Sequence, residues 1–351
     1  MNDFAAMRAA LALARRGLGT TWPNPAVGCV IVNEGRVVGR GWTQPGGRPH
    51  AEAEALARAG AAARGATAYV TLEPCRHAGR GPPCAQSLVA AGVARVVAAI
   101  EDPFPGVAGK GFGLLRDAGI AVEVGLGAAE AGEVNAGFLQ RVNTGRPLVT
   151  LKLAASLDGR IATASGESRW ITGPAARERA HALRASHDAI LVGTGTVLAD
   201  DPELTCRLPG LSGRSPLRVV FDRHLRLPPT AKVFAPPCWV LTLADAAPDV
   251  RARGVEAITV PDDLAAALQV LGERGLTRML VEGGGRLAAS LLKADLVDRL
   301  VWMRAPMTIG GDGIPAIADL GLQQLAAAAR FELVSSKRAG ADVVETFRRM
   351  G

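Results

Sequence analysis

Short strand-like runs alternate with helical segments along the first part of the chain. Two runs, Val27–Val32 and Val37–Trp42, flank a turn and predict a hairpin. A helix follows over 49–65, and further strands and helices alternate up to residue 125. Because such alternation is typical of helices packed on the faces of a sheet, we predict an α/β/α sandwich for residues 1–145.

A second α/β unit is predicted for residues 146–351. It begins with a strand at 148–156 and continues through a helix at 175–185, a strand at 189–193 and a turn-rich segment at 194–207. Further strands and a helix are predicted at 217–222, 238–243 and 278–302. The segment Val142–Pro147 contains Gly and Pro and is the expected linker.

The length of the chain agrees with two compact domains. The 351 residues are about twice a typical domain. The net charge is +7, but the basic residues are spread along the chain and aromatic residues make up only 4%, so we expect no nucleic-acid partner. Phosphorylated small molecules suit the positive charge equally well.

The predicted location is the cytoplasm, with no membrane partner. No apolar run reaches the length of a membrane span, and the N-terminal stretch predicts an amphipathic helix interrupted by Arg8 rather than a signal peptide. The five cysteines have irregular spacing, which does not indicate a disulfide framework. A pair of thiols in such a chain more often binds a metal or takes part in catalysis.

One set of residues has the composition of a zinc site. His50 lies at a helix start, Cys75 follows a buried strand, and Cys84 comes after eight intervening residues. One imidazole and two thiolates suit zinc and leave a fourth position open for water, as in a catalytic site. Glu52, two residues from the histidine, can move a proton between water and a leaving amine. The pattern His-x-Glu followed by Pro-Cys is the signature of zinc deaminases.

A purely structural site is the alternative. His77 could supply a fourth ligand and close the coordination sphere, which would leave Glu52 as an ordinary helix residue. The joint occurrence of "HAE" after a hairpin and "LEPC" after a buried strand favours the catalytic interpretation. The general deaminase signature has two residues between its cysteines, whereas this chain has eight. The longer spacing restricts the deaminase families to which the chain can belong.

The chain resembles, nearly end to end, the bifunctional enzymes of riboflavin biosynthesis that join a pyrimidine deaminase to a reductase. The resemblance rests on long segments in both halves: "NPAVGCVIV", "PHAEAEAL", "ATAYVTLEPCRHAGRGPPC", "VAGKG", "LKLAASLDGRIATASGESRWITG", "LRASHDAILVGTGTVLADDPELTCR" and "VEGGGRLAASLL". It implies a cytidine-deaminase-like domain followed by a dihydrofolate-reductase-like domain. It also implies two reactions, in which diaminohydroxyphosphoribosylaminopyrimidine loses a ring amine as ammonia and NADPH then reduces the phosphoribosyl group to a ribityl chain.

The resemblance assigns roles in the deaminase half. It implies zinc ligands at His50, Cys75 and Cys84, a proton shuttle at Glu52, and contacts with the pyrimidine nucleotide from Asn24, His77 and Arg80. The charged, Gly- and Pro-rich loop between the cysteines is suited to bind a phosphate. Three positions around this pocket depart from the family, which often has His, Thr and Asn where this chain has Thr43, Gly81 and Phe104.

The reductase half has no nucleophile with a base, and its roles rest mainly on the resemblance. Gly283, Gly285 and Ala288 match a dinucleotide pattern, but too near the C-terminus to open a doubly wound domain. The implied NADPH-site residues are Ala154, Trp170, Thr196, Asp200, Gly284, Gly285, Arg286, Leu287, Ala288, Ala289 and Ser290. The implied substrate-site residues are Ser168, Arg184, Leu204, Arg207 and Glu282.

The chemistry of several side chains in this half can be considered apart from the resemblance. Arg184 and Arg207 can act as forks for a ribose phosphate. The pair Asp200-Asp201 can equally form a turn and helix cap. Lys152 and Asp158 are polar candidates near the cofactor.

Three other functions remain open on the sequence. The first is a deaminase of nucleic-acid bases with a targeting domain, which would show steep salt dependence of binding. The second is a zinc-stabilised binding protein without turnover. The third is a reductase whose deaminase half is impaired by the departures at Thr43, Gly81 and Phe104. By resemblance we expect a homo-oligomer, a dimer or tetramer.

Overall fold

The computed structural model describes residues 1–76, 81–104, 106–243 and 255–350. Two compact units make up the chain, Met1–Gly145 and Arg146–Gly351. His77 and Arg80, predicted to contact the substrate, lie outside the described residues. All five cysteines are free, as their spacing predicted.

The first unit is built on a five-stranded sheet in the order β2-β1-β3-β4-β5. Strand β1 pairs antiparallel with β2 and with β3, whereas β3, β4 and β5 are parallel. The strands are β1 (Gly28–Asn33), β2 (Arg36–Trp42), β3 (Thr67–Val70), β4 (Arg95–Ala98) and β5 (Ala121–Val124). The helices are α1 (Asp3–Ala14), α2 (Ala51–Ala59), α3 (Cys84–Ala90), α4 (Lys110–Asp117), α5 (Ala128–Val134) and α6 (Ala136–Thr144).

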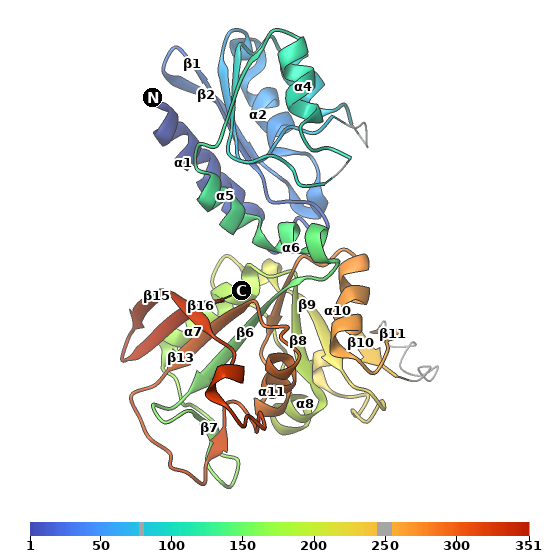
Figure 1. Cartoon of the computed structure of the whole chain (residues 1–351), viewed down its shortest axis with the longest axis vertical. Helices are drawn as coiled ribbons and strands as arrows, with labels where there is room; N and C mark the ends of the chain where they lie inside the picture. The colour runs from blue at the N-terminus through green and yellow to red at the C-terminus, as the bar shows by residue number, and fades with distance from the viewer. Residues whose placement is uncertain (77–80, 105, 244–254, 351) are drawn as a thin grey trace. The chain divides into compact units, whose positions relative to one another are not determined.

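Helices cover both faces of this sheet, which confirms the predicted sandwich (Figure 1). On one face α2, α3 and α4 pack against strand residues through a core that includes Ala55, Leu88 and Phe112. On the other face α1 and α5 bury Met7, Leu11 and Ala131, among others. Alternate residues of β1 point to the two cores, as the period of a strand requires.

The second unit is built on a nine-stranded sheet in the order β11-β10-β9-β8-β12-β6-β13-β16-β15. Neighbours from β11 to β13 are parallel, and β16 and β15 extend the sheet antiparallel. The parallel strands are β6 (Leu148–Ala155), β8 (Ala189–Gly193), β9 (Leu217–Phe221), β10 (Cys238–Thr242), β11 (Val255–Thr259), β12 (Arg278–Val281) and β13 (Arg299–Arg304).

The remaining elements of the second unit complete its sheet and its helical layers. The antiparallel strands are β15 (Phe331–Ala339) and β16 (Asp342–Arg349), and a small ladder joins β7 (Arg160–Ala162) to β14 (Ile314–Pro315). The helices are α7 (Pro174–Ala185), α8 (Thr194–Asp200), α10 (Leu264–Glu273) and α11 (Gly285–Lys293). Among the described residues, no helix combines the length and the apolar character that crossing a membrane requires.

The boundary between the two units, after Gly145, falls inside the expected linker Val142–Pro147. The first residues of this segment belong to α6, which runs to Thr144 and ends on Gly145 in the left-handed conformation with a φ of 78°. One local prediction was wrong. The segment 194–200, expected to form turns, is helix α8. Its Val197 is buried in the core beside β8 and β9, so tertiary packing overrides the low helix propensity of Gly and Thr.

Candidate functional site

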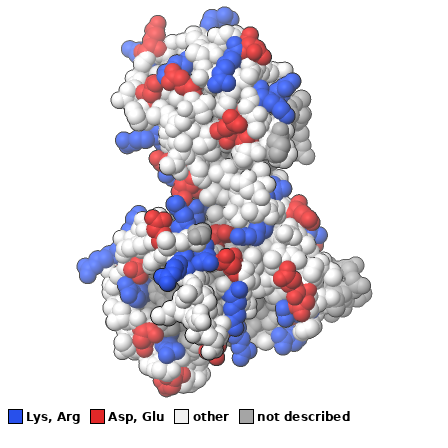
Figure 2. All heavy atoms as spheres, viewed as in Figure 1, with Lys and Arg blue, Asp and Glu red and all other residues white. Residues whose placement is uncertain are grey.

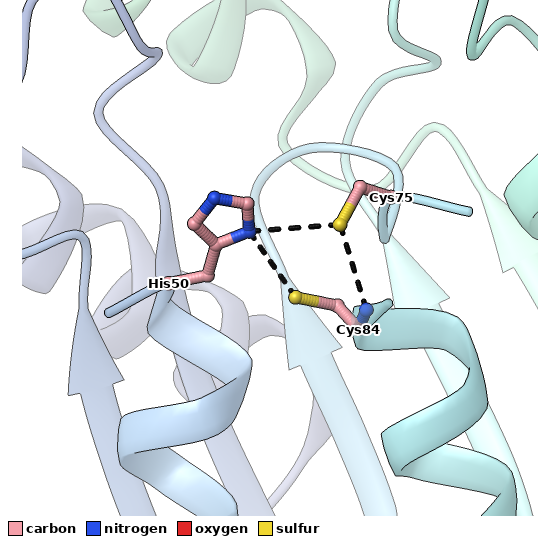
Figure 3. Close-up of side chains that lie close together, drawn as sticks. All are labelled: His50, Cys75 and Cys84. Atoms are coloured by element: carbon pink, nitrogen blue, oxygen red, sulfur yellow. Dashed lines mark hydrogen bonds between the residues drawn. The ribbon is translucent and has the colours of Figure 1, made fainter. Parts of the chain in front are cut away.

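The side chains of His50, Cys75 and Cys84 come together in the first unit (Figure 3). His50 immediately precedes α2, Cys75 follows β3, and Cys84 is the first residue of α3. His50 Nδ1 lies 3.2 Å from Cys84 Sγ and 3.6 Å from Cys75 Sγ. The backbone N–H of Cys84 donates to Cys75 Sγ over 3.5 Å.

The donor set and its spacing fit zinc. With usual Zn–N and Zn–S bond lengths, tetrahedral ligand atoms lie about 3.6 to 3.8 Å apart. The three ligand atoms here all lie within 4.8 Å of one another. The hydrogen bond with Cys84, followed by that from His50, lowers the pKa of Cys75 to about 4 despite burial, so this ligand is a thiolate at neutral pH.

Glu52 lies in the first turn of α2, beside the cluster, and its side chain is buried. Burial raises the pKa of its carboxyl to about 7, against the opposing effect of the His50 imidazole. A buried carboxyl that exchanges a proton near neutral pH is suited to general acid and base chemistry. The role of Glu52 as the proton shuttle stays a prediction.

Asn24 lies in the loop before β1, and Thr43 directly follows β2. Asn24 is half-buried and packs on Gly47, where an added Cβ would lie 1.8 Å from Asn24 Nδ2. Thr43 is buried, and its hydroxyl accepts a hydrogen bond from the Val27 N–H over 3.0 Å. Thr43 therefore stabilises the start of β1 through its backbone. At this position, where the family often has histidine, the threonine side chain is hydrogen-bonded to the backbone of Val27.

The other two departures are exposed. Gly81 is exposed, and Phe104 has 52% of its surface accessible. The sequence analysis also missed two buried acidic residues of the first unit, Asp102 and Glu73. Glu73 follows β3 and accepts four backbone hydrogen bonds. Its place two residues before Cys75 was the only available signal.

The second unit contains a cavity of about 800 Å³. It is lined by all five predicted substrate-site residues, Ser168, Arg184, Leu204, Arg207 and Glu282. Five predicted NADPH-site residues also line it, Ala154, Trp170, Thr196, Asp200 and Gly284. The lining also includes side chains that the sequence did not single out, namely the cations Arg169, Arg177 and Lys232 and the imidazole of His181.

A network of ion pairs lies at the base of this cavity. The Glu282 carboxylate accepts from Arg184 Nε over 2.7 Å and from Arg184 Nη2 over 3.0 Å, and Lys152 Nζ lies 3.4 Å away. Burial raises the pKa of Glu282, but Lys152 and Arg184 outweigh it and hold the pKa at about 2. The Arg184 fork thus binds Glu282, and Arg207 makes only an exposed pair with Glu203 at 3.6 Å.

The predicted glycine loop is largely helical. Gly285–Ser290 form the first turns of α11, where Gly285, Ala288 and Ala289 are buried and Arg286 and Ser290 are exposed. The Gly284 N–H donates to Thr196 Oγ1 over 3.1 Å, which ties α11 to α8. Only Gly283 and Gly284 of this glycine-rich stretch are among the cavity-lining residues.

Asp201 and Asp158 are bound to other parts of the unit. Asp201 caps α8, accepts from the Lys232 N–H over 2.9 Å and pairs with its Nζ at 3.2 Å. Asp158 accepts from Ser156 Oγ and from the backbone N–H groups of Ile309 and Gly310, and it is absent from the lining residues. Lys152, the other polar candidate, does line the cavity.

Comparison with known proteins identifies a family for each unit. A family model of the cytidine and deoxycytidylate deaminase zinc-binding region matches residues 1–100, and one of the RibD C-terminal domain matches residues 147–345. The riboflavin biosynthesis protein RibD of Escherichia coli (strain K12) is 46% identical over 363 aligned positions, which cover 98% of each chain. This chain belongs to the RibD family.

Solved RibD structures share the whole architecture. Acinetobacter baumannii RibD, form 1, is 41% identical, with a TM-score of 0.93 over 99% of both chains. A Thermotoga maritima structure described as a diaminohydroxyphosphoribosylaminopyrimidine deaminase/5-amino-6-(5-phosphoribosylamino)uracil reductase is 34% identical, with a TM-score of 0.89 over 99% of this chain and 98% of that one. The cytidine-deaminase-like and dihydrofolate-reductase-like folds are thereby confirmed.

As a RibD protein, the chain is a bifunctional deaminase and reductase of riboflavin biosynthesis. Its deaminase domain is of the zinc-binding kind and contains the His50, Cys75 and Cys84 cluster. Its reductase domain uses NADPH.

On the face shown in Figure 2, basic side chains lie among acidic ones.

Proposed function

We propose that the first unit deaminates 2,5-diamino-6-(5-phosphoribosylamino)pyrimidin-4-one and that the second unit reduces the ribosyl group of 5-amino-6-(5-phosphoribosylamino)uracil to ribityl. The observation that carries this proposal is the three-ligand cluster with the buried Glu52 carboxyl beside it. The Thermotoga maritima relative, described by the same two activities, supports the choice of substrates.

In the deaminase site, we assign zinc to His50, Cys75 and Cys84 and proton transfer to Glu52. Zinc, when bound, supplies a Lewis acid that activates water. With zinc bound, the Glu52 carboxylate would accept a proton from the attacking water and return it to the departing amine, and its buried place in the first turn of α2 suits it to both transfers. We assign contacts with the pyrimidine nucleotide to Asn24 and, outside the described residues, to His77 and Arg80.

In the reductase site, we place both ligands in the cavity of the second unit. NADPH, when bound, supplies the hydride. Arg184 and Glu282 contribute an ion pair to the lining, and we assign Ser168, Leu204 and Arg207 to the substrate as well. For NADPH we propose Ala154, Trp170, Thr196 and Asp200, which line the cavity. We also propose the stretch Gly284–Ser290, in which Gly284 is the residue that lines the cavity.

The test is a coupled assay on the zinc-loaded full chain. The diaminopyrimidine ribotide is added, ammonia release is measured, and NADPH oxidation is followed in the same sample. Wild type should do both. Glu52→Gln should lose ammonia release by roughly 10² to 10⁴-fold, because general acid and base catalysis contributes about that much. The variant should still oxidise NADPH when given the deaminated ribotide.

Two results would change the assignment. Reduction of the deaminated ribotide without any ammonia release from the first substrate would make the protein a reductase alone, with Thr43, Gly81 and Phe104 as the first positions to restore. Full ammonia release by Glu52→Gln would remove Glu52 from proton transfer.

We further propose a cytoplasmic homo-oligomer, a dimer or tetramer. Strand β15 is at the edge of the nine-stranded sheet, and its Leu333 and Val334 are 54% and 49% exposed. An edge strand with exposed apolar side chains is a surface that another chain can cover. Light scattering on the purified protein tests this, and a mass of 36.2 kDa at all concentrations would contradict it.

A further inference from the structure

Glu73 is a buried acidic residue next to the metal cluster that the proposed mechanism does not use. It follows β3 in the sequence Leu72-Glu73-Pro74-Cys75, and only 3% of its surface is accessible. Its own N–H donates to the Ile100 carbonyl over 3.0 Å, which fixes the residue beside the chain leaving β4. A buried carboxylate needs partners, so its hydrogen bonds show what it holds.

All the partners of the Glu73 carboxylate are backbone N–H groups. Oε1 accepts from Gly111 over 2.8 Å and from Phe112 over 3.2 Å. Oε2 accepts from Gly109 over 3.0 Å and from Asp102 over 3.3 Å. An ionised carboxylate offers about four lone-pair positions, so these bonds occupy its acceptor capacity. Glu73 is therefore poorly suited to shuttle a proton, in contrast to Glu52.

The same carboxylate caps helix α4. Gly109 at the helix start is in the left-handed conformation, and no side chain of its own segment caps the helix. The first N–H groups of a helix need acceptors, and a negative charge there is favourable. The Glu73 carboxylate supplies both the acceptor atoms and the negative charge, from the segment that follows β3.

The start of α4 also lies directly against the peptide before Cys75. A Cβ added at Gly111 would lie 2.0 Å from the Pro74 carbonyl oxygen, which is closer than any side chain could approach. Strands β3 and β4 are adjacent and parallel, so the segments leaving them meet at one edge of the sheet. Glu73 thus links three parts, namely Pro74–Cys75 after β3, Asp102 after β4, and the start of α4.

We propose that Glu73 is a positioning residue for the deaminase substrate. It holds Asp102 and the first turn of α4 against Pro74–Cys75, and so fixes one wall of the pyrimidine pocket relative to the metal cluster. Asp102 is buried, and its Oδ1 accepts from the Phe104 N–H over 2.9 Å, so this wall is itself ordered. The inference rests on the proposed deaminase function.

The test is Glu73→Gln in the zinc-loaded full chain. The amide keeps the volume but turns an NH₂ group toward backbone N–H donors, so at least one oxygen's bonds are lost. We expect the KM for the diaminopyrimidine ribotide to rise roughly ten- to hundredfold with a smaller change in kcat, because small misplacements of a binding wall cost about that much. Zinc content and reductase activity should remain those of wild type.

The matched control is Glu123→Gln, an exposed acid on β5 that pairs with Arg95. It should leave the KM within about twofold, as expected for a surface substitution. Glu73→Asp keeps the charge but shortens the reach, so its KM should lie between those of wild type and Glu73→Gln. A KM for Glu73→Asp at or above that of Glu73→Gln would contradict the proposal.

Three further outcomes would overturn it. Loss of zinc together with activity would make Glu73 a support of the metal cluster or of the fold. A fall in kcat as large as that of Glu52→Gln, with unchanged KM, would make it a proton-transfer group. Unchanged kinetics would show that the wall does not depend on Glu73. If wild type itself releases no ammonia, the proposed function fails, and this result is distinct from the other three.

Discussion

The two units hold their buried carboxylates in different ways. In the first unit Glu73 is surrounded by backbone N–H groups from the chain after β4 and from α4. In the second unit Glu282 is held by the side-chain cations of Arg184 and Lys152. Backbone donors carry no net charge and fix the course of the chain. Side-chain cations balance a charge and can rearrange when an anionic ligand enters, so the first site is organised by shape and the second by charge.

The largest expected effect comes from metal removal, which separates the two sites. Chelation of zinc should lower ammonia release by more than about a hundredfold, since even loss of an outer partner of a metal ligand costs roughly ten- to hundredfold. Reductase activity on the deaminated ribotide should not change, because its cavity residues all belong to the second unit. Restoring zinc should restore ammonia release. A parallel loss of NADPH oxidation would contradict the separation of the sites.

The next effect tests the charge balance of the reductase site. Glu282→Gln leaves Lys152 and Arg184 without their carboxylate, and these side chains are only 15% and 13% exposed. Breaking such a buried pair costs about 3–5 kcal/mol. Calorimetry of the full chain should show one of two transitions moving to lower temperature.

A matched surface pair provides the control for this experiment. Glu256 pairs with Arg274, and the two side chains are 49% and 37% exposed. Glu256→Gln should change the unfolding free energy by less than about 1 kcal/mol. Equal shifts for the two variants would show that burial of the Glu282 network contributes nothing.

The smallest effect concerns acid stability of the second unit. His187 is buried, and burial lowers its pKa to about 3, below the value of about 6.5 expected in the unfolded chain. Its Nδ1 faces the Leu183 carbonyl at 2.7 Å and must donate, so Nε2 accepts from Thr150 Oγ1 at 3.0 Å and the ring is neutral. Protonation favours the unfolded chain, so this contribution is complete above pH 6.5 and is lost as pH falls toward 3.

Chemical unfolding of wild type and His187→Gln between pH 7 and 4 measures this contribution. The difference between them should be constant near pH 7 and should shrink below pH 6.5 by up to about 1.4 kcal/mol per pH unit. Taking the difference removes the opposing contribution of the neighbouring Asp188, whose pKa burial raises. A pH-independent difference for His187→Gln would refute the prediction.

The sequence was most informative where chemistry is encoded over short distances. The three metal ligands lie between residues 50 and 84, next to a strand end and two helix starts that local patterns also indicate. Their residue types restrict the ligand to a few metals. Both the cluster and the sandwich around it could therefore be predicted.

What the sequence did not reveal depends on distant contacts. Lys152 and Glu282 are 130 positions apart, and no local pattern shows that the Arg184 fork binds this carboxylate. The hydroxyl of Thr43 bonds to Val27, and the partners of Glu73 are backbone groups, which are the same at nearly every position. Such partners become known only when the strands are placed side by side.

The hydrogen-bond partners of the Glu73 carboxylate affect how freely the amino-acid sequence around it can change in evolution. The hydrogen bonds that the carboxylate accepts come from the main-chain N–H groups of Asp102, Gly109, Gly111 and Phe112. Every residue except proline offers the same N–H group. Side chains nearby, such as that of Phe104, can therefore be exchanged while the path of the main chain is preserved. A single buried acid at position 73 would thus allow side chains around the substrate to change while the main chain that carries them keeps its course.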